Sequence, residues 1–140
     1  MVVAASAIKV MIVDDDEMMR KLTRRTLEKM GFTQIYAAKD GAEALDLARS
    51  QHPHVIISDY DMPTMHGLQF LKAIRQEPGL EKTGFIMLSG VANGAVVAKA
   101  TELGADKVVM KPFSAADLKQ KLEALVHQLT GSRIDRKLAS

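Results

Sequence analysis

Five short apolar segments, most of them rich in β-branched residues, alternate along this chain with five stretches of helical periodicity. Such alternation predicts parallel strands joined by helices that cover both faces of one sheet, and right-handed crossovers make the sheet doubly wound. We therefore expect an α/β fold with five parallel strands and five helices. The expected strands cover residues 8–13, 35–38, 55–59, 85–88 and 108–110.

The expected helices follow these strands, and two of them carry a clear apolar stripe that should be buried. The first stripe consists of Met19, Leu22, Thr26 and Met30, and the last consists of Leu118, Leu122, Leu125 and Leu129. A weaker, alanine-rich helix is expected from about Asn93 to Leu103. Periodicity ends near residue 130, so we expect one domain over residues 1–130 and a tail over residues 131–140.

Composition excludes several classes of protein. Hydrophobic residues make up 47% of the chain, and a net charge of only +2 with mixed signs argues against direct nucleic-acid binding. The chain has no cysteine, which excludes disulfides and thiol chemistry. No apolar run approaches the ~20 residues that a membrane span needs. We expect a soluble, cytoplasmic protein.

Four of the five expected strands end in residues suited to phosphate or metal chemistry. Asp14 and Asp15 follow the first strand, Asp59 ends the third, Ser89 follows the fourth and Lys111 follows the fifth. The carboxyl ends of parallel strands share one edge of the sheet, where open α/β folds bind their ligands. Three carboxylates, a hydroxyl and an ammonium group should therefore converge there.

Three close carboxylates repel one another, and the repulsion raises at least one pKa unless a cation compensates. A site of oxygen ligands alone selects a hard ion, which we expect to be Mg²⁺, with Mn²⁺ as an alternative. Asp59 would then be free to attack a phosphoryl group and form an aspartyl phosphate. Lys111 and Ser89 could stabilise the charge on the transferred group.

The same residues lie in motifs that resemble the receiver domain of two-component response regulators, the CheY-like family, across residues 8–129. The matching motifs are Ile12-Val-Asp-Asp15, Ile57-Ser-Asp-Tyr-Asp-Met-Pro63, Met65-His-Gly67, Leu88-Ser-Gly90 and Val109-Met-Lys-Pro-Phe113. The resemblance implies the strand order 2-1-3-4-5. It also implies a signalling domain whose only reactions are phosphotransfer to itself and autodephosphorylation.

The resemblance implies specific roles at the acidic site. Asp59 would take its phosphoryl group from the phosphohistidine of a histidine kinase or a phosphotransfer protein. Asp15 and Asp59 would ligate Mg²⁺ directly, together with the backbone carbonyl of Asp61, whereas Asp14 would act through a water molecule. Ser89 would hydrogen-bond the phosphoryl group.

Further implications concern the remaining groups and the partners. Lys111 would form an ion pair at the site, and the Lys111–Pro112 peptide bond would be cis. A downstream protein target would bind the surface made by the fourth helix, the fifth strand and the fifth helix. No membrane and no nucleic acid would be contacted directly.

Three positions depart from the usual pattern of this family. Val108 stands where an aromatic residue often acts as a rotating switch, so switching by aromatic rotation is not expected. Asp61 replaces a commoner Asn or Met, and it adds a carboxylate beside Asp59. His66 stands where an acidic or small polar residue is common, and the sequence assigns it no role.

Simpler structural explanations compete for single motifs. The acidic run 14–17 could merely cap a helix, and Asp59 alone could be a turn residue. His52 and His54 flank a proline at a strand entrance, and we interpret them as surface residues.

Other functions compete for the whole set. A phosphatase of the haloacid dehalogenase type would use Asp59 and Asp61 as paired acids, but that family places its nucleophile on the first strand. A pseudo-receiver that only binds partners would not need the complete set of reactive groups. A flavodoxin-like flavin protein would need a loop rich in Ser, Thr and Gly after the first strand, and none follows it.

The extra carboxylate at Asp61 gives a testable prediction. We expect the Asp61→Asn substitution to change the rate at which the phosphorylated protein loses phosphate, because the side chain stands two residues from the phosphoacceptor. Phosphate release from the isolated phosphoprotein measures this rate. An unchanged rate would contradict the prediction.

Overall fold

The main sheet has the expected architecture. The computed structural model describes residues 2–90 and 94–135, and its five parallel strands lie in the order β3-β2-β4-β5-β6. Counted within this sheet, that is the order 2-1-3-4-5, so the predicted fold class and strand order are confirmed. The strands are β2 (Lys9–Val13), β3 (Gln34–Ala38), β4 (Val55–Asp59), β5 (Gly84–Ser89) and β6 (Lys107–Met110).

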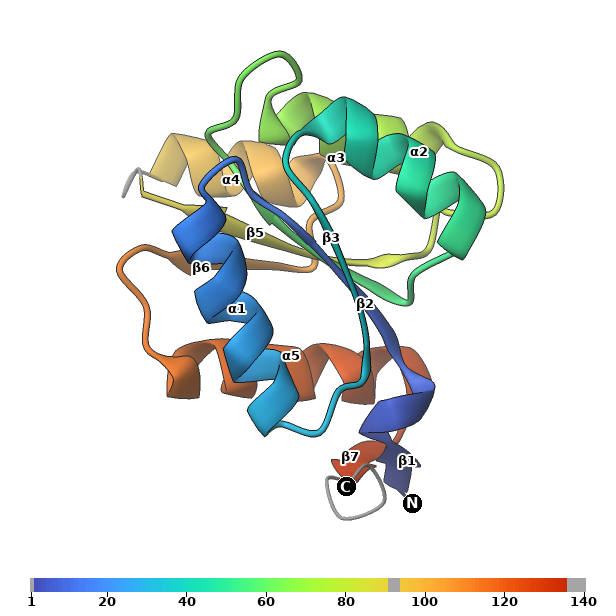
Figure 1. The fold of residues 1–140 in the computed structure, drawn as a ribbon. Coiled ribbons are helices and arrows are strands. Elements are labelled where there is room, and N and C mark those ends of the chain that lie inside the picture. Colours follow the sequence, from blue (N-terminus) through green and yellow to red (C-terminus); the bar gives the residue numbers. More distant parts are fainter. Residues whose placement is uncertain (1, 91–93, 136–140) are drawn as a thin grey trace.

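Helices cover both faces of this sheet. Figure 1 shows α1 and α5 below it and α2, α3 and α4 above it. They are α1 (Glu17–Lys29), α2 (Gly41–Gln51), α3 (Gly67–Gln76), α4 (Gly94–Glu102) and α5 (Ala115–Thr130). The expected helix start at Asn93 lies outside the described residues. Across residues 2–90 and 94–135, no helix combines the length and the apolar character that a membrane span requires.

The burial of the central strand β4 explains why its sequence is continuously apolar. Every residue of β4 is buried. Val55 and Ile57 face the hydrophobic cluster shared with α1 and α5, whereas Ile56 faces the cluster shared with α2 and α3. A strand covered on both faces shows continuous apolar character rather than alternation. The buried strand then carries Asp59 at its end, which gives the site a rigid base.

The buried face of α1 differs from the predicted stripe. Thr23, Leu27 and Met30 are buried, whereas 49% of the surface of Leu22 is exposed to solvent. Leu22 lies beside an open groove of about 970 Å³ between α1 and the start of α5, which we name the α1–α5 groove. The groove is lined among others by Met19, Leu22, Thr26, Pro112 and Phe113. Since α5 does not close over this side of α1, apolar character there does not lead to burial.

The last helix follows its predicted stripe except at the end. Leu118, Leu122 and Leu125 are fully buried, whereas Leu129 is 41% exposed. Ser114 and Asp117 form a capping box at the start of this helix, in which Ser114 Oγ accepts from the Asp117 N–H and Asp117 accepts from the Ser114 N–H.

The two ends of the chain form a second, small sheet that the sequence analysis missed. Strand β1 (Val2–Ala4) pairs in parallel with β7 (Arg133–Asp135), and a 3₁₀ turn, η1 (Ala5–Ala7), leads from β1 toward β2. Figure 1 shows both strands together at one end of the molecule. The sequence predicts a tail over residues 131–140, yet part of it is this strand. Residues 136–140 lie outside the described part, and the domain boundary at residue 130 stays a prediction.

Candidate functional site

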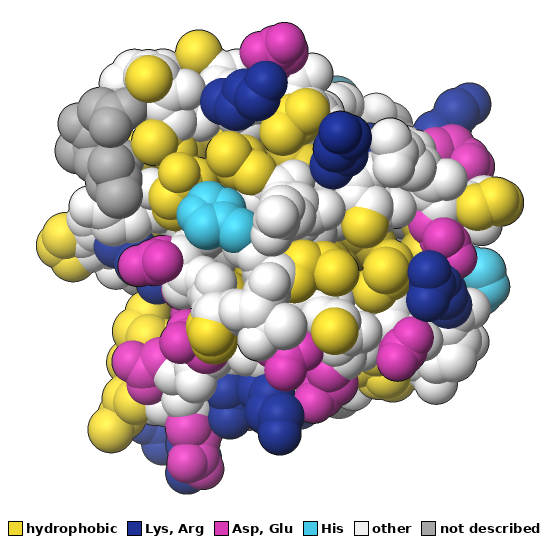
Figure 2. All heavy atoms as spheres, turned by 90° about the horizontal axis from the view of Figure 1, so that it is seen from above, with side chains coloured by type: hydrophobic (Ala, Val, Ile, Leu, Met, Phe, Trp, Pro, Cys, Tyr) yellow, Lys and Arg dark blue, Asp and Glu magenta, His cyan; other side chains and the backbone are white. Residues whose placement is uncertain are grey.

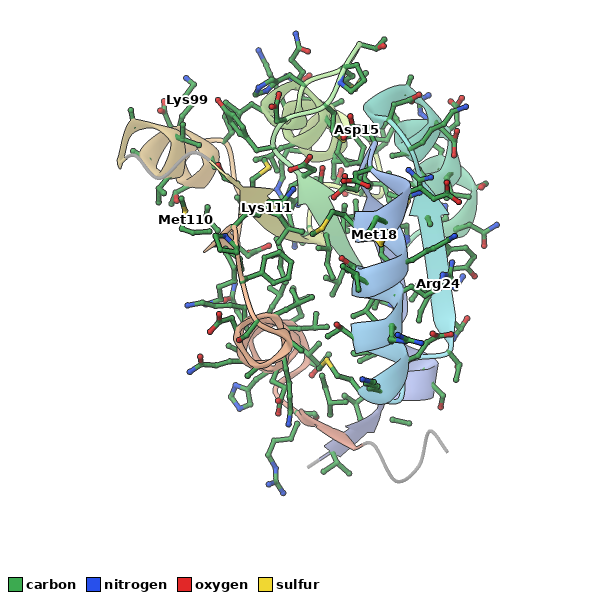
Figure 3. All side chains as sticks on the ribbon, turned by 60° about the vertical axis from the view of Figure 1, so that its left-hand side comes forward. Asp15, Met18, Arg24, Lys99, Met110 and Lys111 are labelled. Carbon is green, nitrogen blue, oxygen red and sulfur yellow. The ribbon has the colours of Figure 1, made fainter. Side chains whose placement is uncertain are left out.

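Four predicted site residues stand at the carboxyl edge of the main sheet. Asp14 directly follows β2, and its N–H donates to Ala38 O at 3.1 Å, so the strand pairing extends to it. Asp59 and Ser89 are the last residues of β4 and β5. The Lys111 N–H donates to Ser89 O at 2.7 Å, which fixes the turn after β6. In Figure 3, Lys111 and Asp15 lie at this same end of the sheet.

Asp14 and Asp59 bring their carboxylates together with that of Asp15. One carboxylate oxygen from each of Asp14, Asp15 and Asp59 lies within 4.8 Å of the other two. Asp14 and Asp59 are buried, with 2% and 5% of their surface exposed, whereas Asp15 is exposed. We call this group the acidic cluster. It lies at a solvent-accessible edge, with one carboxylate facing water and two within the protein.

Lys111 supplies a positive charge to the acidic cluster. Its Nζ donates to Asp59 Oδ1 at 2.8 Å and lies 3.8 Å from Asp14 Oδ2. Burial by itself would lower the pKa of Lys111. The hydrogen bond to Asp59 and the negative charges of the acidic cluster outweigh that effect and raise the pKa above its ordinary value of 10.5. Lys111 therefore stays charged at neutral pH.

Asp14 is the residue with an incomplete set of partners. Burial is the main cause that raises the pKa of its carboxyl above 3.8, and the charges of Asp59 and Asp15 act in the same direction. The N–H of Asp16 donates to Oδ1, but Oδ2 is buried and has no hydrogen bond among the residues that the structure describes. A buried carboxylate oxygen without a hydrogen bond, beside two more carboxylates, fits a hard divalent cation such as Mg²⁺.

Ser89 and Asp61 differ in how they relate to the acidic cluster. Ser89 is fully buried at the end of β5, next to β4 on one side and β6 on the other. Asp61 lies in the loop between β4 and α3, where its side chain is exposed and does not belong to the cluster. The role of its backbone carbonyl as a metal ligand stays a prediction.

The loop after Asp59 is held by local contacts that give His66 a structural role. His66 caps α3: its Nδ1 accepts from the Leu68 N–H at 3.4 Å, and its own N–H donates to Gln69 Oε1 at 2.9 Å. Its ring meets the ring of Tyr60 edge-on, with 4.3 Å between the centroids. Gly67 follows, and a Cβ there would lie 2.5 Å from Asp59 O, so only glycine allows this approach.

The acidic residues 14–17 that follow β2 have different structural roles. Asp16 is the helix cap, since its Oδ1 accepts from the N–H groups of Met18 and Met19. Asp14 and Asp15 belong instead to the acidic cluster. The capping explanation thus holds for Asp16, and Glu17 lies in the first turn of α1, where its charge complements the helix dipole. Sequence reasoning also missed Arg20, whose Nη1 donates to Asp14 O at 2.7 Å.

Two smaller expectations agree with the structure. The Lys111–Pro112 bond is cis. His52 and His54 are exposed residues at the opposite end of β4 from Asp59.

Comparisons with known proteins agree with this geometry. The family profile described as "Response regulator receiver domain" matches residues 10–123. A probable chemotaxis protein CheY of Rhizobium etli is 40% identical over 121 residues, which cover 86% of this chain and 94% of that protein. The chemotaxis protein CheY of Pseudomonas aeruginosa is 32% identical over 123 residues, or 88% of this chain and 99% of that protein.

Solved structures show the same likeness. Vibrio cholerae CheY4 superimposes with a TM-score of 0.80 at 33% identity, covering 84% of this chain and 98% of that one. The receiver domain of a signal transduction histidine kinase from Syntrophus aciditrophicus superimposes with a TM-score of 0.81 at 25% identity, covering 90% and 95% of the two chains.

The raised pKa of Asp14 predicts how stability depends on pH. The folded protein holds a proton on this carboxyl more tightly than the unfolded chain does, because its pKa exceeds 3.8. The resulting stabilisation is present below the unfolded pKa and is lost as pH rises through the folded pKa. Without divalent cations at neutral pH, Asp14→Asn should therefore raise the free energy of unfolding.

Thermal unfolding at neutral pH and at about pH 3 measures this effect. The difference between wild type and Asp14→Asn should shrink in acid, where both side chains are neutral. Asp46→Asn, which alters a carboxylate with 82% of its side chain exposed, is the matched control and should change little. A variant at position 14 that is less stable than wild type at neutral pH would contradict the prediction.

Proposed function

This chain belongs to the family of response regulator receiver domains, and from that premise we propose that Asp59 is its phosphoacceptor. The proposed donor is the phosphohistidine of a histidine kinase or of a phosphotransfer protein. The observation that carries the proposal is the placement of Asp59 at the buried end of β4, inside the acidic cluster and 2.8 Å from Lys111 Nζ. The family makes the chain a signalling domain in two-component systems.

The proposed reaction is a transfer between two side chains. A carboxylate oxygen of Asp59 attacks phosphorus, the phosphorus–nitrogen bond to the donor imidazole breaks, and a phosphorus–oxygen bond forms. The leaving imidazole takes up a proton from solvent. Lys111 then pairs with a phosphoryl oxygen in place of Asp59 Oδ1, and the Ser89 hydroxyl donates to another phosphoryl oxygen. Apart from this transfer and the later hydrolysis of the aspartyl phosphate, we propose no catalytic turnover.

The acidic cluster supports a divalent cation at this site. In our proposal Asp15 and Asp59 ligate Mg²⁺ directly with the backbone carbonyl of Asp61, and Asp14 acts through a water molecule, with Mn²⁺ as a substitute. The support is the set of three oxygen donors and the buried Oδ2 of Asp14, which has no hydrogen bond among the described residues. The cation, when bound, would offset repulsion between the carboxylates and the incoming phosphoryl oxygens.

A protein donor needs a surface beside Asp59, and the α1–α5 groove offers one. Lys111 and Pro112 lie at its wall, so it adjoins the phosphoacceptor site. Its interior is largely apolar, and Arg25, Lys29 and Lys119 lie along it. A donor helix with apolar and acidic side chains would match this composition.

For the downstream target we propose the surface formed by α4, β6 and α5. Strand β6 leads directly into Lys111, so a change in the Lys111 ion pair reaches this surface first. Val108 in β6 is half-buried and not aromatic, which leaves movement of backbone and of Lys111 to carry the signal.

The surface also bears on the class of partner. Figure 2 shows the side formed by α2, α3 and α4, where acidic, basic and hydrophobic side chains are interspersed without a continuous basic patch on that face. This supports protein partners rather than direct contact with nucleic acid. We place the proposed reaction in the cytoplasm, which fits a chain without cysteine.

Intact mass spectrometry tests the proposed phosphoacceptor. Wild type and Asp59→Asn are each incubated with acetyl phosphate and Mg²⁺. We expect a labile phosphoryl adduct on wild type only, lost in alkali as an acyl phosphate is. An adduct of equal yield on Asp59→Asn would overturn the assignment. Continuous turnover of p-nitrophenyl phosphate by the wild type would instead indicate a phosphatase.

A further inference from the structure

Three hydrogen bonds link Asp14, Asp16 and Arg20 into a closed ring at the start of α1. The Asp16 N–H donates to Asp14 Oδ1 at 2.9 Å, Arg20 Nη1 donates to Asp14 O at 2.7 Å, and the Arg20 N–H donates to Asp16 O at 3.0 Å. Asp16 also caps α1, so the ring is continuous with a helix end. We call it the Asp14 ring.

The Asp14 ring determines which carboxylate oxygen of Asp14 meets the acidic cluster. Oδ1 accepts a hydrogen bond within the ring, whereas Oδ2 lies 3.8 Å from Lys111 Nζ and has no hydrogen bond among the described residues. A buried oxygen without a hydrogen bond costs about 1–3 kcal/mol. Because the terminal torsion of Asp has a broad, two-fold profile, a carboxylate that was not held would rotate to find a partner. The orientation of Asp14 therefore needs an external restraint.

Arg20 provides that restraint on the backbone side. Its guanidinium is half-buried and binds the main-chain carbonyl of Asp14 rather than a carboxylate. It thereby fixes the peptide that joins β2 to the acidic run, while the Asp16 N–H fixes the side chain. Both contacts come from α1 or from its N-terminal cap, whereas Asp14 Oδ2 lies 3.8 Å from Lys111 Nζ.

We propose that Arg20 is a positioning residue for the phosphorylation site: by holding the backbone of Asp14, it keeps Asp14 Oδ2 directed into the acidic cluster, where a divalent cation binds. The proposal rests on the function proposed above. It assigns Arg20 no contact with the phosphoryl group.

The guanidinium of Arg20 could also act through its charge alone. Positioning of Asp14 would strengthen Mg²⁺ binding, whereas the positive charge would weaken it. A permanent cation bound to the backbone of Asp14 would weaken the binding of a second cation nearby. If charge dominated, removing Arg20 would tighten Mg²⁺ binding. If positioning dominates, removing Arg20 weakens Mg²⁺ binding, and loss of such outer contacts typically costs about 10–100-fold in metal affinity.

The test compares Arg20→Met, Arg20→Gln and Arg20→Lys with wild type. The Met variant keeps most of the side-chain length but loses the hydrogen-bond donor and the positive charge. The Gln variant keeps a hydrogen-bond donor without the charge, and the Lys variant keeps both a donor and the charge. Arg24→Met is the matched control: Arg24 lies one turn further along α1, is half-buried, and donates to Ile35 O at 3.4 Å. Figure 3 shows Arg24 further along the helix, away from Asp15 and Lys111.

Two readouts are needed. Calorimetric titration with MgCl₂ gives the dissociation constant, and carboxyl NMR of the metal-free protein at fixed pH gives the environment and rotamer of Asp14. We expect the Arg20→Met dissociation constant to rise about tenfold, with partial recovery in the Lys and Gln variants. The Asp14 carboxyl resonance should shift or broaden in Arg20→Met. Arg24→Met should resemble wild type in both readouts.

Unchanged or tighter Mg²⁺ binding by Arg20→Met would overturn the proposal, as would an unchanged Asp14 resonance. Equal losses in Arg20→Met and Arg24→Met would also overturn it, since they would indicate a general effect on α1. Failure of the proposed function is distinguishable, because it would show as a wild type that neither binds Mg²⁺ nor accepts phosphate. The metal-free NMR comparison would still decide whether Arg20 positions Asp14.

Discussion

The acidic cluster and Lys111 form one electrostatic unit on which the rest of the site depends. Lys111 Nζ bonds Asp59 at 2.8 Å and stands 3.8 Å from Asp14, so one ammonium group balances part of the charge of two buried carboxylates. Removing one partner of a buried pair costs about 3–5 kcal/mol, which is an upper limit here because Lys111 keeps 24% of its side-chain exposure. The three carboxylates still carry more negative charge than the one ammonium group of Lys111 offsets. This excess of negative charge favours the binding of a divalent cation.

The parallel sheet makes this concentration of charge structurally possible. Strands β4 and β5 are buried along their whole lengths, and their ends are tied across the edge by the Tyr60 N–H, which donates to Leu88 O at 2.8 Å. Burial of apolar side chains on both faces offsets the unfavourable burial of Asp14 and Asp59. The fold thus holds in place a group of charges that would separate in a flexible loop.

Sequence reasoning succeeds where chemistry follows directly from topology. Asp59 could be identified because a buried apolar strand ends in it, and parallel strands bring such ends together. The buried face of α1 could not be read from hydrophobicity, since Leu22 faces an open groove. Strands β1 and β7 have three residues each, too few to show a period. Arg20 donates a hydrogen bond to the backbone carbonyl of a residue six positions earlier, and no local sequence pattern predicts such a contact.

The central claim is that Asp14, Asp15 and Asp59 act as a single cation site. Carboxyl NMR during a titration of the wild-type protein with Mg²⁺ tests it most directly. The account predicts that the three side-chain resonances change together with one dissociation constant, while that of the exposed Asp46 stays constant. Resonances that follow separate dissociation constants, or that do not respond while Asp46 does, would contradict it.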